Sequence, residues 1–190
     1  MTIKKEYCPN CFQIIGEGVT RCPYCGLRDF ERTNLLALPV NAFIHDRYIM
    51  GRVLGAGGFG ITYKSYDTKT DKICAIKEYV PLDNATRNKD DFSLSATNSS
   101  RKELFEYGKK KFLLEAETLR KLKNISDVVK IMDCFSENGT AYFVMEYLDG
   151  SSLNGVRRSA GGRLPFDRGR RRAGRAHGRK AFPRDGVPHR

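Results

Sequence analysis

The sequence predicts an α+β fold, and three observations carry this prediction. Three β-prone segments follow one another at 47–55, 61–67 and 72–80, each rich in β-branched or aromatic residues. One segment with helical periodicity comes next, from about Ser99 to Leu122. Two more β-prone segments follow at 127–135 and 140–148, joined by the turn sequence SENG. The expected order is therefore strand, strand, strand, helix, strand, strand.

A cysteine-rich module is expected in front of this fold, at residues 1–30. Two C-P-x-C pairs lie ten residues apart, and their thiols are the candidate metal ligands Cys8, Cys11, Cys22 and Cys25. Each C-x-x-C turn aims two thiolates at one point, so two turns complete a closed tetrahedral Zn²⁺ site. A redox pair is the alternative for a single C-x-x-C, but two pairs with proline in the same place favour a structural zinc ribbon.

The connecting segments have weaker signals. Residues 31–46 contain Pro39 and no clear period, so we expect a linker that docks on the β-rich domain behind it. Residues 82–100 are polar and rich in turn formers, which indicates a surface insertion. Ser99 or Ser100 is expected to cap the helix, with Glu103 in its first turn, and Gly108 is a candidate break between two helical pieces.

Charge separates the tail from the rest of the chain. The net charge is +12, but residues 151–190 hold 12 Lys and Arg against two Asp, a net +10. The first 150 residues carry only +2, so binding to nucleic acid is not the expected function of the fold. No apolar run is long enough to span a membrane, and no secretory signal opens the chain. We therefore expect a reducing, cytoplasmic setting, with Cys74 and Cys134 as core thiols.

A glycine-rich loop is the second candidate site. Residues 54–60, LGAGGFG, contain G-x-G-x-x-G, a spacing that dinucleotide-binding folds also use. In those folds the glycines join a strand to a helix, whereas here the alternating, β-prone segment 61–67 follows Gly60. The loop is therefore expected to form a hairpin over phosphate groups, with glycines that let the backbone approach oxygen atoms closely.

A lysine and a glutamate accompany the loop. Ala75 and Lys77 share one face of the expected strand 72–80, which leaves room for a base and lets the ammonium reach phosphate. Glu115 on the helix can pair with Lys77, while Glu117 lies about 200° further around the helix and should face water. An ordinary exposed ion pair, worth under about 1 kcal/mol, is the alternative interpretation when the two residues are taken alone.

Together these motifs resemble the bacterial eukaryote-like (Hanks-type) serine/threonine protein kinases. Gly55, Gly57 and Gly60, Lys77 and Glu115 match the family's glycine-rich loop, strand lysine and helix glutamate. The resemblance implies a kinase N-lobe over 47–153, a five-stranded antiparallel sheet with one helix that binds ATP with Mg²⁺. It further implies that Lys77 and Glu115 form an ion pair that positions ATP. The implied nucleotide contacts are Leu54, Gly55, Ala56, Gly57, Gly58, Phe59, Gly60, Thr62, Ala75, Lys77, Met145 (beside adenine), and the backbones of Glu146 and Leu148.

The sequence departs from the family in three respects. Thr62 and Cys74 stand where the family usually has valine, and Lys77 is unusually far from Glu115, which we assign to the insertion 82–100. No H-R-D or D-F-G occurs in the 190 residues, so we expect no phosphoryl transfer from this polypeptide alone, whereas the intact family phosphorylates protein serine and threonine.

The tail 154–190 is rich in Arg and Gly and is expected to be disordered or the product of a frameshift after Asp167. A genuine basic tail is the alternative. It would make the chain a pseudokinase-like binding module that recruits partners through the zinc ribbon and the tail.

Overall fold

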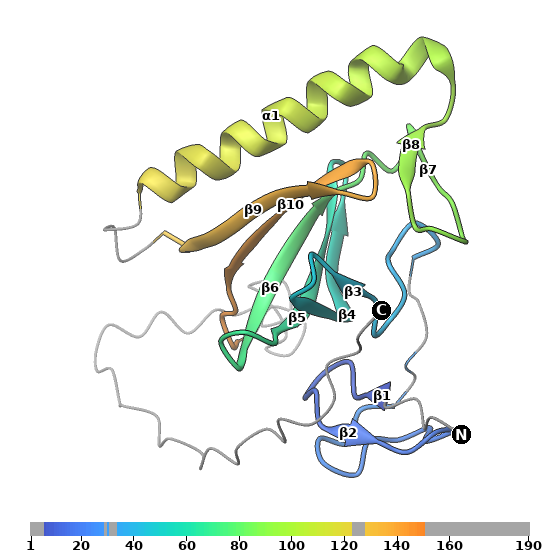
Figure 1. The fold of residues 1–190 in the computed structure, drawn as a ribbon, viewed down its shortest axis with the longest axis vertical. Coiled ribbons are helices and arrows are strands. Elements are labelled where there is room, and N and C mark those ends of the chain that lie inside the picture. Colours follow the sequence, from blue (N-terminus) through green and yellow to red (C-terminus); the bar gives the residue numbers. More distant parts are fainter. Residues whose placement is uncertain (1–5, 29, 31–33, 123–127, 151–190) are drawn as a thin grey trace, which may run out of the picture. The chain divides into compact units, whose positions relative to one another are not determined.

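A computed structural model of the chain describes residues 6–28, 30, 34–122 and 128–150; the predicted tail at 154–190 lies outside them. Figure 1 shows its main feature, a six-stranded antiparallel sheet with one long helix across it. In spatial order the strands are β3 (Phe43–Ile44), β4 (Tyr48–Gly57), β5 (Gly60–Asp67), β6 (Lys72–Tyr79), β10 (Thr140–Glu146) and β9 (Ile131–Glu137). The five predicted strands are confirmed, and β3 is an added edge strand from within the predicted linker.

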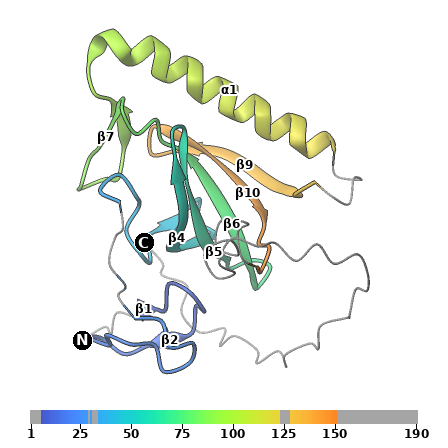
Figure 2. The same cartoon turned by 180° about the vertical axis from the view of Figure 1, so that it is seen from behind.

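The helix α1 (Lys102–Lys121) lies over β9 and β10, as the views from both sides show (Figures 1 and 2). Phe105, Phe112 and Ala116 are its buried residues, spaced so that they fall on one face. The predicted break at Gly108 is wrong. This glycine allows close packing instead, because a Cβ atom there would collide with the hydroxyl of Tyr79.

The predicted serine cap is also wrong. A 3₁₀ turn, η1 (Ser99–Arg101), precedes α1, and the side chain of Asn98 accepts a hydrogen bond from the Arg101 amide at 3.1 Å. The side chain of Ser100 instead donates to Asn98. The side-chain cap therefore lies one or two residues earlier than expected and belongs to η1, while α1 itself begins after Arg101 without a side-chain cap.

The insertion is more than a surface loop. It forms a hairpin of β7 (Ala85–Arg87) and β8 (Leu94–Ala96), in which Ala85 and Leu94 are buried. The side chain of Arg87 is only 2% exposed, because it pairs with Glu78 of β6. The expectation of a wholly surface insertion is wrong at these positions, because the polar segment contains a hairpin that packs on the core.

The linker docks on the sheet, as expected. Ala37, Leu38 and Ile44 are buried in the main core, and the Leu38 amide donates to the Tyr63 hydroxyl at 3.1 Å.

The cysteine module precedes the linker in the sequence. In it, β1 (Glu6–Tyr7) and β2 (Ile14–Ile15) form a small hairpin with its own core around Cys8, Ile15 and Cys22. Everything described up to Tyr147 belongs to one compact unit, and Leu148 begins a second.

Candidate nucleotide and metal sites

The glycine-rich loop joins two strands of one hairpin, as predicted. Gly57 faces Gly60 at the end of the β4–β5 ladder, and Gly58 and Phe59 form the turn between them. Phe59 is 77% exposed at the tip. Strand-to-strand connection excludes the dinucleotide-binding arrangement, in which a helix N-terminus would follow the loop.

The glycines of this loop have two different roles. A Cβ atom added at Gly55, Gly57 or Gly58 would have no heavy atom within 4 Å, so the backbone there faces open space. At Gly60 the Cβ would lie 2.5 Å from the carbonyl oxygen of Glu78 on the neighbouring strand. Gly60 is therefore required by strand packing, whereas the other three leave a surface that phosphate oxygens can approach.

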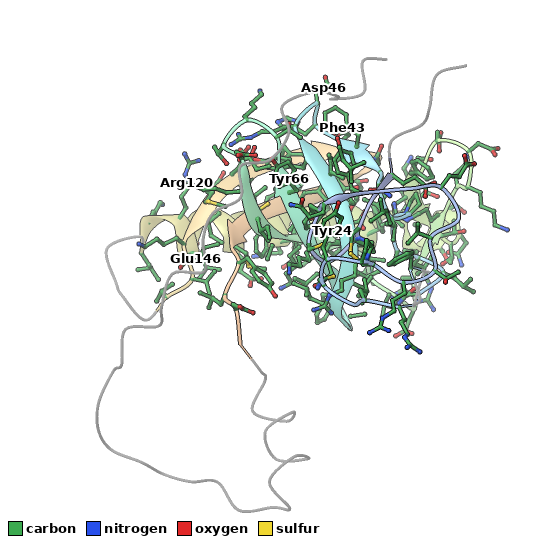
Figure 3. All side chains as sticks on the ribbon, turned by 90° about the horizontal axis from the view of Figure 1, so that it is seen from below. Tyr24, Phe43, Asp46, Tyr66, Arg120 and Glu146 are labelled. Atoms are coloured by element: carbon green, nitrogen blue, oxygen red, sulfur yellow. The ribbon has the colours of Figure 1, made fainter. Side chains whose placement is uncertain are left out.

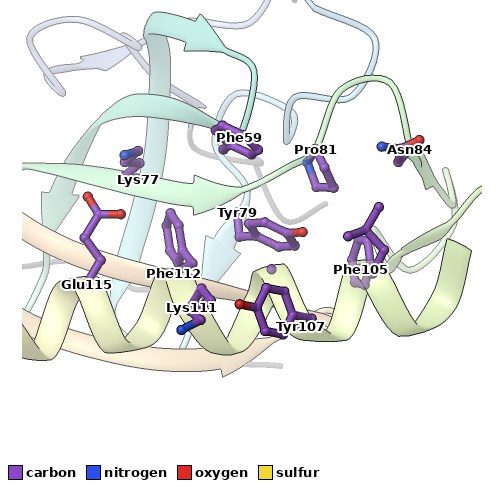
Figure 4. Close-up of a pocket in the computed structure, with 12 residues that line it drawn as sticks. Phe59, Lys77, Tyr79, Pro81, Asn84, Phe105, Tyr107, Lys111, Phe112 and Glu115 are labelled. Atoms are coloured by element: carbon purple, nitrogen blue, oxygen red, sulfur yellow. The ribbon is translucent and has the colours of Figure 1, made fainter.

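Lys77 and Glu115 line the same cavity, of about 570 Å³, between β6, the loop tip and α1. In Figure 4 the Glu115 carboxylate points toward Lys77. The ion pairs found among the described residues do not include these two, so no nitrogen–oxygen contact within 4.0 Å joins them. The Lys77 ammonium lies over the rings of Phe112 and Phe143, 5.6 and 5.5 Å from their centroids. The structure thus places Lys77 and Glu115 at one cavity, but no ion pair joins them.

The expected adenine-side residues gather on adjacent strands. Ala75 pairs with Met145 across β6 and β10, and Thr62 pairs with Lys77 across β5 and β6. Met145 and Glu146 are half-buried at the end of β10, and the Glu146 amide donates to the Lys130 carbonyl at 3.1 Å. Leu54 and Leu148 are both exposed, and Ala56 lies in the open part of the loop. Thr62, Ala75, Lys77 and Met145 thus occupy neighbouring positions on β5, β6 and β10.

A buried polar network behind Lys77 was not predicted. Glu78 is fully buried on the opposite face of β6. Its carboxylate accepts hydrogen bonds from the hydroxyls of Tyr63 at 2.6 Å and Tyr142 at 2.8 Å, and from Arg87 at 2.7 Å. Burial opposes the charge of Arg87, but the facing carboxylate raises its pKa. The network fixes the strand that carries Lys77.

The four predicted metal ligands converge. The sulfur atoms of Cys8, Cys11, Cys22 and Cys25 all lie within 4.8 Å of one another. The Cys8–Cys25 and Cys11–Cys22 sulfur distances are both 3.6 Å. A tetrahedral zinc ion with Zn–S bonds of about 2.3 Å would place its sulfurs about 3.8 Å apart. The four thiols therefore fit a zinc ion with little rearrangement.

The pKa values of the thiols are shifted in different directions. Burial raises the pKa of Cys8 and of Cys11. Burial acts in the same direction on Cys25, but hydrogen bonds from the Leu27 amide, the Asn10 side chain and neighbouring thiols outweigh it and lower that pKa to about 7. Because zinc binds thiolates, the metal would displace the protons of the buried thiols.

Comparisons with known proteins agree with this geometry. The model of the family described as "Protein kinase domain" matches residues 48–171. Serine/threonine-protein kinase D of Synechocystis sp. is 32% identical over 120 residues, which are 62% of this chain and 21% of that protein. Serine/threonine-protein kinase B of the same organism is 31% identical over 113 residues, 58% of this chain and 17% of its own length.

A solved structure, "PpkA-294 apo form", superposes with a TM-score of 0.61 at 30% identity and covers 65% of this chain and 43% of its own. The chain thus spans about a fifth of the length of the two Synechocystis kinases. Because the family model covers well over half of the chain, this chain belongs to the protein kinase domain family.

Proposed function

We propose that the described lobe is the ATP-binding portion of a protein serine/threonine kinase. One observation supports this most directly: Lys77, the helix glutamate Glu115 and Phe59, at the tip of the glycine-rich hairpin, line one cavity. In this proposal the amides of Gly55, Gly57 and Gly58 face the phosphates, and the Lys77 ammonium neutralises phosphate oxygens. Glu115 closes on Lys77 when nucleotide is bound, replacing the aromatic rings that now face the ammonium.

ATP with Mg²⁺ is the proposed cofactor, and protein serine or threonine is the proposed acceptor in the intact family. The residues that hold magnesium and orient the acceptor hydroxyl belong to H-R-D and D-F-G motifs. Neither motif occurs in residues 1–190. We therefore propose that residues 1–190 position the nucleotide but do not by themselves transfer its phosphoryl group.

The proposed role of the four cysteines is to hold a structural Zn²⁺ ion. All four coordination positions would be filled by sulfur, which leaves none for water or substrate.

No helix in the described part of the chain is both long and apolar enough to cross a membrane. The described cysteines carry free thiols, which agrees with the proposed reducing, cytoplasmic setting.

A thermal-shift titration with Mg-ATP tests the nucleotide proposal. A ligand present at about 100 times its Kd stabilises a protein by about 2.7 kcal/mol, so a shift of several degrees is expected for the wild-type chain. Lys77→Ala should lose most of that shift. Lys72→Ala is the matched control, because Lys72 is an exposed lysine at the start of the same strand. Equal shifts for Lys77→Ala and the wild type would contradict the proposal.

A further inference from the structure

The two cysteine turns differ at the residue that follows each pair. In both turns this residue donates its amide to the carbonyl of the first cysteine: Phe12 to Cys8 at 2.9 Å and Gly26 to Cys22 at 3.0 Å. Both residues have positive φ, 56° for Phe12 and 74° for Gly26. Glycine adopts this conformation readily, whereas a phenylalanine there is strained. The first turn therefore has a conformationally unfavourable residue, Phe12, at the position where the second turn has glycine, Gly26.

The ring of Phe12 has a partner outside the cysteine module. Phe12 is fully buried, and its ring stacks on Tyr66 of β5, with centroids 5.7 Å apart. Its Cζ atom would lie 2.7 Å from a Cβ atom at Gly51 of β4. The ring, together with the carbonyl oxygens of Pro9 and Lys64, thus occupies the space that a side chain at Gly51 would need. Stacking and burial of an aromatic ring account for keeping the strained phenylalanine.

Polar contacts of the same turn flank this ring. The β4–β5 register shifts between Met50 and Val53, and within this irregularity the Arg52 amide donates to the Pro9 carbonyl at 2.9 Å. Asn10 accepts hydrogen bonds from Arg52 Nε at 3.0 Å and from Lys64 Nζ at 3.2 Å. Three features of the first turn, a carbonyl, an amide side chain and a ring, therefore contact the two strands that carry the glycine-rich loop.

The second turn contributes no comparable contact at the equivalent side chain. Tyr24, labelled in Figure 3, takes the place of Asn10 in the C-P-x-C sequence. It is 65% exposed. The strained residue and the contacts therefore occur in the same turn. The first turn has the strained phenylalanine and the contacts to β4 and β5, whereas the second has glycine and an exposed tyrosine.

We propose that the turn Cys8–Phe12 is an internal docking element that braces β4 and β5, so that metal binding by the four cysteines orders the glycine-rich hairpin as well as the cysteine module. Cys8 and Cys11 bracket Pro9 and Asn10, and the metal would fix the shape of the turn that presents Phe12. Loss of the metal lets the turn relax from its strained conformation and withdraws the ring from Tyr66. The metal dependence rests on the zinc binding proposed above, whereas the docking rests on contacts that involve no metal.

Hydrogen exchange on the full chain tests both parts. Phe12→Gly deletes the ring but suits the left-handed turn, so it should retain one zinc ion per chain. We expect its amides in β4 and β5, that of Arg52 above all, to exchange about tenfold faster or more than in the wild type. Tyr24→Ala removes an aromatic residue from the other turn and should leave these rates unchanged. Chelation of zinc from the wild type should accelerate the same amides.

The following outcomes would overturn all or part of the proposal. If Phe12→Gly keeps wild-type exchange in β4 and β5, the ring does not brace the strands. If chelation accelerates exchange only within residues 6–28, metal binding is not coupled to the hairpin. Absence of zinc from the purified wild type would refute the metal dependence and the zinc proposal, while the Phe12→Gly comparison would still decide the docking. If Phe12→Gly does not fold, Asn10→Ala is tested instead. We expect the Arg52 amide to exchange faster in this variant than in the wild type. Unchanged exchange of this amide would overturn the docking.

Discussion

Arg87 of the β7–β8 hairpin donates to the Glu78 carboxylate of β6 at 2.7 Å, and both side chains are withdrawn from solvent, 2% and 0% exposed. Arg87 also donates to the backbone carbonyls of Leu36 and Phe92, at 2.6 and 2.7 Å. One guanidinium thus joins the linker, the insertion and the central sheet. A buried pair is maintained by such additional hydrogen bonds, because the attraction of the two charges alone only roughly offsets their desolvation.

Arg87→Gln should therefore be strongly destabilising. It leaves the Glu78 carboxylate buried with only the hydroxyls of Tyr63 and Tyr142, and breaking a buried pair in this way costs about 3–5 kcal/mol. Lys89→Gln is the matched control, an exposed position in the same hairpin whose effect should lie within about 0.5 kcal/mol. Urea unfolding measures both. A similar, small loss for the two variants would contradict the proposed anchoring role.

The loop glycines allow stability and binding to be separated. Gly60→Ala places a Cβ 2.5 Å from the Glu78 carbonyl, so the strands must part and the midpoint of thermal unfolding should fall by several degrees. Gly57→Ala meets no heavy atom within 4 Å and should leave that midpoint within about 1–2 °C of wild type. If the loop covers phosphate, Gly57→Ala should instead weaken Mg-ATP binding in the titration. Equal destabilisation by both substitutions would refute this division of roles.

The sheet and its site could be predicted from sequence because their signals are local. The alternation in 61–67 and 72–80 and the helical spacing of Phe105, Phe112 and Ala116 each lie within one segment. The four cysteines were found in the same way, since two C-x-x-C turns carry their own geometry.

The features that escaped prediction depend on side-chain contacts between different secondary-structure elements. Arg87 in a polar stretch gave no sign of burial, because its partner Glu78 lies in another element, β6, which does not pair with the hairpin strand of Arg87. Gly108 was a candidate break in the helix, whereas in the structure it gives room for the ring of Tyr79. A usable signal did exist at Phe12: two matched C-P-x-C turns followed by phenylalanine in one and glycine in the other.

Metal content should depend on four of the six cysteines. Cys25→Ser removes one of the converging sulfurs, and we expect zinc bound per chain to fall well below one, because closed structural sites use all four ligands. Cys134→Ser is the matched control, since Cys134 is half-buried in β9 and packs against the main core. Elemental analysis after gel filtration measures both variants. Full zinc content in Cys25→Ser would rule out a four-sulfur site.

The pH dependence of stability has an identifiable contributor in Asp67. Arg47 donates two hydrogen bonds of 2.8 Å to this carboxylate, and Thr70 adds a third at 2.6 Å. Burial would raise the pKa of Asp67, but these hydrogen bonds outweigh it and hold the pKa below its ordinary value of 3.8. A depressed folded-state pKa means that the contribution to stability is complete above pH 3.8 and disappears as the pH falls through the folded-state value.

Asp67→Asn should consequently cost about 1.5–3 kcal/mol at pH 7, the range for hydrogen bonds to charged groups. The difference from wild type should shrink once the pH falls below about 4, where the unfolded chain begins to take up the proton. Asp83→Asn, at an exposed aspartate, is the control and should change little at either pH. Urea unfolding at pH 7 and at several lower pH values measures the difference. A loss that stays constant down to the acid limit would mean that the Asp67→Asn substitution disturbs packing rather than removing a charge held by Arg47.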